Sequence, residues 1–238
     1  MSHDNQIYII IPLYNEVKRL LENGLLDKLS NVNFNVLLVN DGSTDDTKKV
    51  LDNIANEKVF VLNLLKNVGK AEAIREGVKW LKDKDLKMFG YLDADLSTPL
   101  FEINNMIEVL KKNSELKMIM GCRLQRFGSN VSRSFVRHIL GRFFATLASL
   151  MLGESVYDTQ CGAKVFKEDL VILFDEKFST RWLFDLELLF RLSKTSNLNN
   201  VCFELPLSQW EDVGGSRLKI TDFIKVPFEL LKIFFRYK

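Results

Sequence analysis

Residues 36–44 read Val36-Leu37-Leu38-Val39-Asn40-Asp41-Gly42-Ser43-Thr44, an apolar run followed directly by a polar one. A short apolar run bounded by turn residues is typical of a strand that is buried on both faces of a sheet. The polar residues suit a tight turn and the start of a helix, for which Thr44 and Asp45 are N-cap candidates. The segment therefore predicts a strand, a turn and a helix in succession.

The same alternation of strand and helix patterns extends on both sides of this segment. Apolar runs predict further strands at residues 7–12, 59–64, 88–92 and 118–120. Helical spacing of apolar residues predicts helices within residues 17–29, 71–81 and 103–110. Elements in this order favour a parallel sheet covered by helices on both faces. The predicted fold class is therefore α/β, with a mostly parallel central sheet flanked by helices and with amphipathic helices in the C-terminal half.

Composition argues against several classes of protein. The chain has 238 residues, of which 47% are hydrophobic, so a single domain can bury a sizeable core. The formal net charge of +2 argues against a globally basic nucleic-acid binder, and we expect no nucleic-acid partner. Three cysteines without CxxC spacing argue against a disulfide framework or a zinc site and fit a reducing compartment. No apolar run reaches the ~18 residues that a membrane-spanning helix needs.

Two segments of the second half combine apolar and basic residues. Residues 116–153 contain six basic residues and no acidic one, and apolar residues within 135–150 follow helical spacing. Residues 223–238 have a similar composition, with Pro227 expected to start or kink the last helix. Such helices can lie on an anionic membrane surface, or they can pack on the core as ordinary helices. The pattern leaves both interpretations open.

Asp93-Ala94-Asp95 follows the apolar run at residues 88–92. Two carboxylates one residue apart at the end of a strand can hold a divalent cation, which in turn binds a diphosphate. Oxygen ligands favour Mg²⁺ or Mn²⁺ over zinc. The alternative is a turn with a helix cap. Asp41 ends another strand of the same predicted sheet, so one ligand at the carboxyl edge could reach all three residues.

Other charged residues fit either a functional or a structural role. Arg123, Arg133 and Arg217 suit bidentate phosphate binding, but each taken alone is typical of a solvated surface charge. Asp185 and Glu187 stand in an otherwise apolar helix, so each is either an ion-paired structural group or an acid or base of the site. The pattern does not separate these alternatives.

Four segments carry a family resemblance. They are Ile11-Pro12-Leu13-Tyr14-Asn15-Glu16, Asn40-Asp41-Gly42-Ser43-Thr44-Asp45, Asn67-Val68-Gly69-Lys70 and Asp93-Ala94-Asp95. Together they resemble the family-2 glycosyltransferases, whose GT-A fold binds nucleotide sugars. Four further segments, residues 133–134 (RS), 158–164 (DTQCGAK), 181–185 (RWLFD) and 215–218 (GSRL), are similar to the dolichyl-phosphate β-glucosyltransferase and polyprenyl-phosphate glycosyltransferase branch.

The resemblance implies an inverting transfer of a sugar, which we expect to be glucose, from a UDP-sugar donor to a polyprenyl (dolichyl-type) phosphate. It places the reaction at the cytoplasmic membrane face, with the protein peripheral on the membrane surface. Residues 1–122 would form the nucleotide-sugar-binding half, and residues 123–238 the acceptor and membrane-surface half. Because no membrane-spanning helix is expected, membrane contact would come from amphipathic segments or a partner. The expected partner is a membrane protein or a second copy of the chain in a homo-oligomer.

The resemblance also implies roles for individual residues. Asp93 and Asp95 would bind Mg²⁺ or Mn²⁺, and the catalytic residues would be Asp93, Asp95 and Asp185. Arg123, Arg133 and Arg217 would hold the donor diphosphate or the acceptor phosphate. The donor would contact Pro12, Tyr14, Glu16, Val39, Asp41, Lys70, Asp93, Ala94 and Asp95. Two positions depart from the family pattern: Ser97 replaces a metal-binding Gln of the mannosyltransferase relatives, and Ala71 follows Lys70 where relatives often have Gly.

Two rival functions remain. One is a soluble family-2 glycosyltransferase that acts on a glycan hydroxyl, with Asp185 as general base. The other is a non-catalytic nucleotide-binding or membrane-scaffold protein. A phosphate acceptor is already anionic near pH 7, so it needs little general-base catalysis, and the barrier falls mainly through positioning and charge on the leaving diphosphate. Asp185→Asn would therefore abolish transfer to a hydroxyl more completely than transfer to a phosphate.

Overall fold

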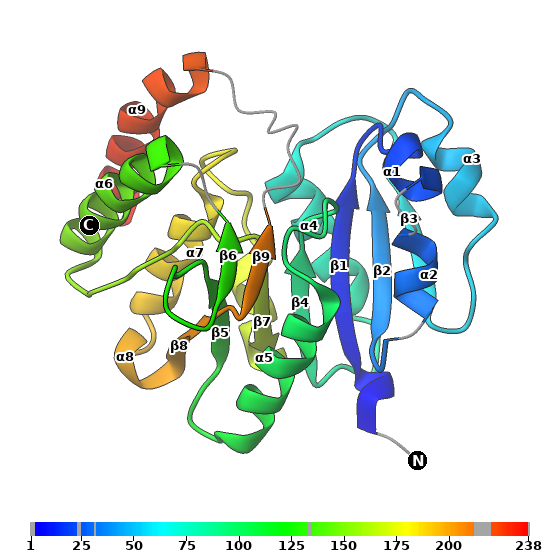
Figure 1. Ribbon diagram of the computed structural model, residues 1–238, viewed down its shortest axis with the longest axis horizontal. Coiled ribbons are helices and arrows are strands. Elements are labelled where there is room, and N and C mark those ends of the chain that lie inside the picture. Colours follow the sequence, from blue (N-terminus) through cyan, green and yellow to red (C-terminus); the bar gives the residue numbers. More distant parts are fainter. Residues whose placement is uncertain (1–2, 23–24, 31, 133–134, 212–219, 238) are drawn as a thin grey trace.

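The computed structural model describes residues 3–22, 25–30, 32–132, 135–211 and 220–237. Within these residues a seven-stranded sheet forms the centre, with strands in the order β3-β2-β1-β4-β7-β5-β8 (Figure 1). They are β1 (Ile7–Leu13), β2 (Asn35–Asn40), β3 (Val59–Asn63), β4 (Met88–Leu92), β5 (Met118–Cys122), β7 (Ala163–Lys167) and β8 (Cys202–Pro206). All paired neighbours are parallel except β7, which is antiparallel to β4 and β5. The expected mostly parallel α/β sheet is confirmed.

The antiparallel direction of β7 matters for the site. Ala163, its first residue, pairs with Leu92, the last residue of β4. The chain segment that leads into β7 therefore lies beside the Asp93-Ala94-Asp95 segment that leads out of β4. Two short strands, β6 (Asn130–Ser132) and β9 (Gln209–Glu211), pair in parallel as a separate ribbon.

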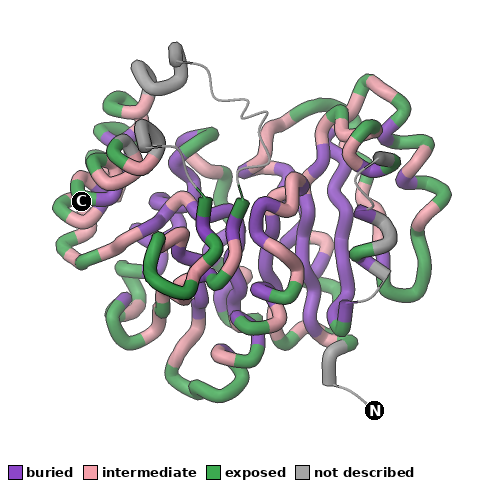
Figure 2. Tube along the Cα trace, viewed as in Figure 1, coloured by how far each residue is buried: buried purple, intermediate pink, exposed green. Residues whose placement is uncertain are grey.

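Helices cover both faces of the sheet because β1 buries alternate side chains on opposite sides. Ile9 and Ile11 pack in the cluster that contains the apolar faces of α1 (Val17–Glu22), α2 (Leu25–Ser30), α3 (Thr47–Asp52) and α5 (Leu100–Lys112). Ile10 packs on the other face, against α4 (Lys70–Leu81), in a cluster that also holds residues of η2 (Glu168–Phe174), α7 (Phe184–Ser193) and α8 (Leu198–Val201). A short 3-10 helix, η1 (His3–Gln6), precedes β1. Figure 2 shows buried residues concentrated along the central strands.

Two local expectations were wrong, and one of the two alternatives given for Pro227 is excluded. The helix after β2 begins at Thr47 with Asp46 as its N-cap residue, although the Asp45 carboxylate does accept a hydrogen bond from the Thr47 backbone N–H. The apolar spacing of residues 17–29 corresponds to two short helices, α1 and α2, and not to one. The last helix, α9 (Ile220–Tyr237), contains Pro227 in its interior, so Pro227 does not start it. Helix ends are the least certain part of any pattern.

The two apolar, basic segments form α6 (Phe135–Leu152) and α9, which lie together at one end of the molecule (Figure 1). Ala148 of α6, Leu230 and Ile233 of α9 and Phe190 of α7 share one buried cluster. The opposite faces of these helices expose large apolar side chains, namely Ile139, Phe143, Leu150, Phe228, Leu231 and Phe235. Each helix therefore combines a packed face with an exposed apolar face. Among the described residues, no helix is sufficiently long and apolar to span a membrane.

Candidate active site

Asp41 lies at the carboxyl end of β2 and organises the loop before α4. Its two carboxylate oxygens accept hydrogen bonds from the backbone N–H groups of Val68 (2.7 Å) and Gly69 (2.9 Å). Gly42, at φ +62°, allows this approach, because a Cβ atom there would lie 2.3 Å from the backbone of Lys66. Burial raises the pKa of the Asp41 carboxyl above its ordinary value of 3.8, although both hydrogen bonds and the charge of Arg181 act in the opposite direction.

Lys70 connects this loop to the carboxylates after β4. Its ammonium lies 2.5 Å from Asp93 Oδ1 and 5.6 Å from the centre of the Phe184 ring. Desolvation opposes the charged form of Lys70, but the carboxylates of Asp93, Asp185 and Asp95 outweigh it and raise the pKa of the amine. Asp41, Lys70 and the Asp93 pair therefore converge at one edge of the sheet, as the positions of their strands predict.

Gly162 forms the wall behind the Asp93 carboxylate. The Asp93 backbone N–H donates to the Gly162 carbonyl at 3.1 Å. A Cβ atom at Gly162 would lie only 1.9 Å from Asp93 Oδ2, so any larger residue would displace this carboxylate. The DTQCG segment thus needs a glycine at position 162, because a side chain there would collide with the first aspartate of the pair.

The DTQCG segment is held in place by its own ion pair. Arg123 binds Asp158 in a bidentate manner, with both Nε and Nη2 2.7 Å from carboxylate oxygens. The side chain of Glu204 accepts the backbone N–H groups of Tyr157 and Asp158. Desolvation disfavours the charged guanidinium, but Asp158 outweighs it and raises the pKa of Arg123. Arg123 was expected to bind phosphate; in this structure its fork holds Asp158, next to the Trp210 ring.

Lys164 is the buried centre beneath this segment. Its ammonium donates to the carbonyls of Thr159 (3.0 Å) and Cys161 (2.7 Å) and to the carboxylate of Asp185. The Tyr91 hydroxyl donates to the same Asp185 oxygen, and Asp185 is 3% exposed. Asp185 is therefore ion-paired in the core. It is also close enough to the site for its charge to act on Lys70. These contacts favour positioning of the surrounding residues over proton abstraction from an acceptor.

Glu187 has a structural role, which settles one of the open alternatives. The carboxylate is completely buried and accepts hydrogen bonds from the backbone N–H of Ser179, from Arg191 and from the Tyr237 hydroxyl. It ties the loop before α7 to α7 itself and to the end of α9.

The Asp93 and Asp95 carboxylates fit a divalent cation of the Mg²⁺ type. Both are partly exposed at the strand end, and Asp95 Oδ1 accepts the Ser97 backbone N–H at 2.9 Å, which orients it. Among the described residues no group of three His, Cys, Asp or Glu side chains could hold a metal. Mg²⁺ sites commonly use only one or two carboxylates and complete their coordination with substrate phosphates and water. A pair of aspartates is sufficient for such a site.

The remaining expected donor residues lie at or near the same edge. Pro12 and Tyr14 are partly exposed at and after the end of β1, and Glu16 forms an ion pair with Arg19 at 2.7 Å. Ala94 lies between the two aspartates and is nearly buried. The side chain of Val39 is completely buried in the core against α4, so it presents none of its surface to a ligand. Arg133 and Arg217 lie outside the described residues.

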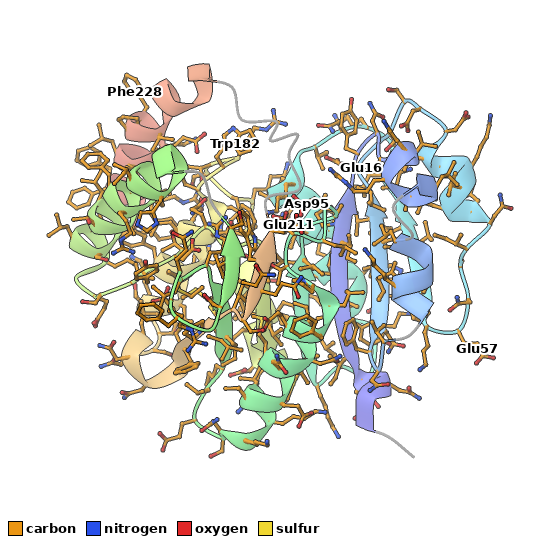
Figure 3. The ribbon with its side chains drawn as sticks, viewed as in Figure 1. Glu16, Glu57, Asp95, Trp182, Glu211 and Phe228 are labelled. Carbon is orange, nitrogen blue, oxygen red and sulfur yellow. The ribbon has the colours of Figure 1, made fainter. Side chains whose placement is uncertain are left out.

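Arg181 is a residue of this site that the sequence reasoning did not assign. It precedes α7, and its guanidinium lies against the Cα of Gly69, since a Cβ atom there would be 2.9 Å from Arg181 Nη2. Its only signal in the sequence was membership of the RWLFD segment. Figure 3 labels the neighbouring Trp182 together with Asp95, which follows β4, and Glu211, which ends β9 of the two-stranded ribbon.

Comparison with known proteins identifies the family of this chain. The family model for glycosyl transferase family 2 matches residues 8–173. A dolichyl-phosphate beta-glucosyltransferase of Trichomonas vaginalis is 34% identical over 255 residues, which cover 98% of this chain and 75% of the relative. The Homo sapiens dolichyl-phosphate beta-glucosyltransferase is 28% identical, with 99% of this chain and 77% of the relative covered.

Solved structures establish the fold. A glucosyl-3-phosphoglycerate synthase of Mycobacterium tuberculosis, in complex with Mn²⁺, uridine diphosphate and glucosyl-3-phosphoglycerate, superposes with a TM-score of 0.66 at 17% identity and covers 96% of this chain and 80% of its own. A mannosyltransferase of Pyrobaculum calidifontis in complex with GDP-mannose and Mn²⁺ gives 0.63 at 15% identity, covering 99% and 64%. The sheet described above is therefore the GT-A fold. With the family model matching more than half of its length, this chain belongs to glycosyl transferase family 2.

Proposed function

We propose that this protein transfers glucose from UDP-glucose to a polyprenyl (dolichyl-type) phosphate at the cytoplasmic face of a membrane. The observation that carries the proposal is the convergence of Asp41, Lys70 and Asp93 at one edge of the sheet. Relatives that match 98% and 99% of this chain and are named as dolichyl-phosphate beta-glucosyltransferases support the choice of sugar and acceptor.

Some of these residues would bind the donor, and others would stabilise the charge on its diphosphate. Asp41 would hold the donor nucleoside together with the loop that it already binds, while Asp93 and Asp95 would hold Mg²⁺ or Mn²⁺. The cation would neutralise charge on the donor diphosphate and so make it a better leaving group. Lys70 would add a fixed positive charge near the same position. Arg133 and Arg217 stay proposed ligands of the donor or acceptor phosphate.

An acceptor phosphate fits this site better than a hydroxyl acceptor. A hydroxyl needs a base that is free to take its proton, whereas Asp185 is 3% exposed and accepts hydrogen bonds from Lys164 and Tyr91. A phosphate monoester is already an anionic nucleophile near pH 7 and needs mainly correct placement.

The exposed apolar faces of α6 and α9 give the protein a means of reaching a lipid-linked acceptor. Phe143 and Leu150 on α6, and Phe228 and Phe235 on α9, are each between 66% and 78% exposed. Apolar side chains presented by amphipathic helices insert at the boundary between headgroups and acyl chains. We propose that this end of the molecule rests on the membrane, with the protein peripheral to it.

The test is sugar transfer from a panel of radiolabelled UDP- and GDP-sugars to a short polyprenyl phosphate, with Mg²⁺, Mn²⁺ or EDTA. We expect a glycolipid from UDP-glucose that requires the metal, and none from the matching polyprenol. Asp93→Asn should abolish the product, whereas Asp169→Asn, which removes a surface partner of Lys117 away from the aspartate pair, should not. Product from a glycan hydroxyl, or nucleotide binding without any product, would replace this proposal with one of its rivals.

A further inference from the structure

The Arg181 guanidinium lies against Gly69, in the loop before α4 that connects Asp41 to Lys70 and Asp93. A Cβ atom at Gly69 would lie 2.9 Å from Nη2 and 3.1 Å from Nε of Arg181, so the fork of the guanidinium covers the glycine backbone. The next residue, Lys70, reaches Asp93, and the preceding loop binds Asp41. Arg181 and Lys70 thus place two cations near the start of α4.

The guanidinium of Arg181 has no hydrogen-bond or ion-pair partner within the described part of the chain. Three other arginines of the described residues are engaged: Arg123 binds Asp158, Arg75 binds Glu72, and Arg191 binds Glu187. The planar fork of arginine is well suited to two oxygens of one phosphate or carboxylate. The part of Arg181 that recognises anions is therefore available.

The backbone that carries Arg181 is fixed from three directions. The Phe178 N–H donates to Glu72 of α4, and the Ser179 N–H donates to Glu187 of α7. Lys232 of α9 donates to the Ser179 carbonyl at 2.7 Å. Thr180 and Leu183, on either side of the exposed Arg181 and Trp182, are buried. An exposed arginine on a fixed loop costs less conformational entropy when it binds a ligand.

We propose that Arg181 binds a phosphate oxygen of a substrate in the sugar-transfer site. The inference rests on the proposed function in that the phosphate belongs either to the donor diphosphate or to the lipid-linked acceptor. The neighbouring Asp41 and Asp93 do not cancel this role, because Asp41 is bonded to the Val68 and Gly69 amides and Asp93 is bonded to Lys70.

The first arm of the test uses binding alone. Uridine and UDP are titrated calorimetrically, with Mn²⁺ present, into the wild type, Arg181→Gln, Arg181→Lys and the control Arg126→Gln. Arg126 is an exposed arginine before β6, and its side chain forms no hydrogen bond or ion pair with the described residues. If the donor diphosphate is the ligand, Arg181→Gln weakens UDP binding about tenfold or more and leaves uridine binding unchanged. The UDP affinity of Arg181→Lys, which keeps the charge but loses the planar guanidinium, lies between those of the wild type and Arg181→Gln.

The second arm measures the KM for a short polyprenyl phosphate at saturating UDP-glucose. If the acceptor phosphate is the ligand, Arg181→Gln raises this KM about tenfold or more while UDP binding stays at the wild-type value. The inference is overturned if neither quantity changes, or if uridine binding and the urea midpoint fall together with UDP binding, because both results indicate a structural role. If the wild type forms no glycolipid, the proposed function fails, and the comparison of uridine with UDP then decides for or against Arg181 by itself.

Discussion

The ammonium of Lys164 donates a hydrogen bond to the carboxylate of Asp185, and neither side chain has appreciable contact with solvent. The same ammonium donates to the carbonyls of Thr159 and Cys161. One buried cation therefore joins α7 to the segment whose Gly162 supports Asp93. The most specific sequence segments of the chain, DTQCGAK and RWLFD, meet at this ion pair.

Removing this cation should be far more costly than removing a surface lysine. Lys164→Met leaves the Asp185 carboxylate buried without a counter-charge, so we expect a loss of about 3–5 kcal/mol of unfolding free energy. Lys82→Met, which breaks the half-exposed ion pair with Asp175, should cost at most about 1 kcal/mol. Urea unfolding followed by circular dichroism measures both.

A double variant separates charge from packing in this experiment. Replacing both partners, in Lys164→Met/Asp185→Leu, removes the uncompensated charge and should recover part of the stability lost in the single variant. A single variant that loses less than about 1 kcal/mol would show that the Asp185 carboxylate finds solvent or another partner, against the geometry described here.

Gly162→Ala tests the support of Asp93 without changing any charge. The added Cβ would lie 1.9 Å from Asp93 Oδ2, so the carboxylate must move. A displacement of about 1 Å at a reacting centre can reduce the rate about 100-fold, and we expect a loss of that size in kcat/KM for sugar transfer. Gly128→Ala is the control for backbone strain without a clash, because Gly128 lies at φ +81°, where a side chain is strained, but a Cβ there meets no atom within 4 Å.

Both glycine variants should be compared at equal folded fraction, measured by urea unfolding. Transfer by Gly162→Ala at more than about half the wild-type rate would mean that Asp93 does not need its present position.

The raised pKa of Asp41 gives a pH dependence with a defined sign. Because the folded state binds this proton more tightly than the unfolded state does, the ionised carboxyl disfavours folding, and the penalty disappears as the pH falls through the folded pKa toward 3.8. Relative to Asp41→Asn, which does not titrate there, the wild type should gain unfolding free energy between pH 7 and pH 4. Urea unfolding of the two proteins at a series of pH values measures this difference, and a difference of opposite slope would show that the bonds from Val68 and Gly69 dominate over burial.

The parts of this fold that repeat a simple pattern were predictable. The apolar runs of β1, β2 and β4 predicted these strands. The acidic residues after β2 and β4 predicted the site, because ligands bind at the carboxyl ends of the strands in such sheets. The direction of β7 was not predictable from pattern, because a short apolar run is the same in either direction. Its antiparallel course is what brings Gly162 to Asp93.

Charged residues were harder to interpret, because a long-range partner has no local signature. In the sequence, Lys164 is indistinguishable from a surface lysine. Its buried partner, Asp185, lies 21 residues further along the chain. Arg123 was assigned to phosphate, but it holds Asp158, 35 residues away. Arg181 was overlooked for the same reason, since only the folded chain places it against Gly69.

The exposed apolar face of α9 gives a prediction that is independent of catalysis. Phe228 and Phe235 are 70% and 78% exposed, whereas Leu230 and Ile233 on the same helix are buried against α6 and α7. Replacing both phenylalanines by aspartate should therefore leave the fold intact and weaken binding to anionic liposomes roughly tenfold or more, because two apolar groups are removed from the lipid boundary. Co-sedimentation with vesicles of phosphatidylserine and phosphatidylcholine measures the binding.

The control is Ile172→Asp, at a residue of η2 that is 66% exposed. Because η2 follows the antiparallel strand β7, it lies at the opposite end of the sheet from Asp93. A loss of binding in Ile172→Asp in proportion to its one added charge, against two in the double variant, would show that the effect is one of net charge. Unchanged binding of the double variant would exclude this face of α9 from membrane contact.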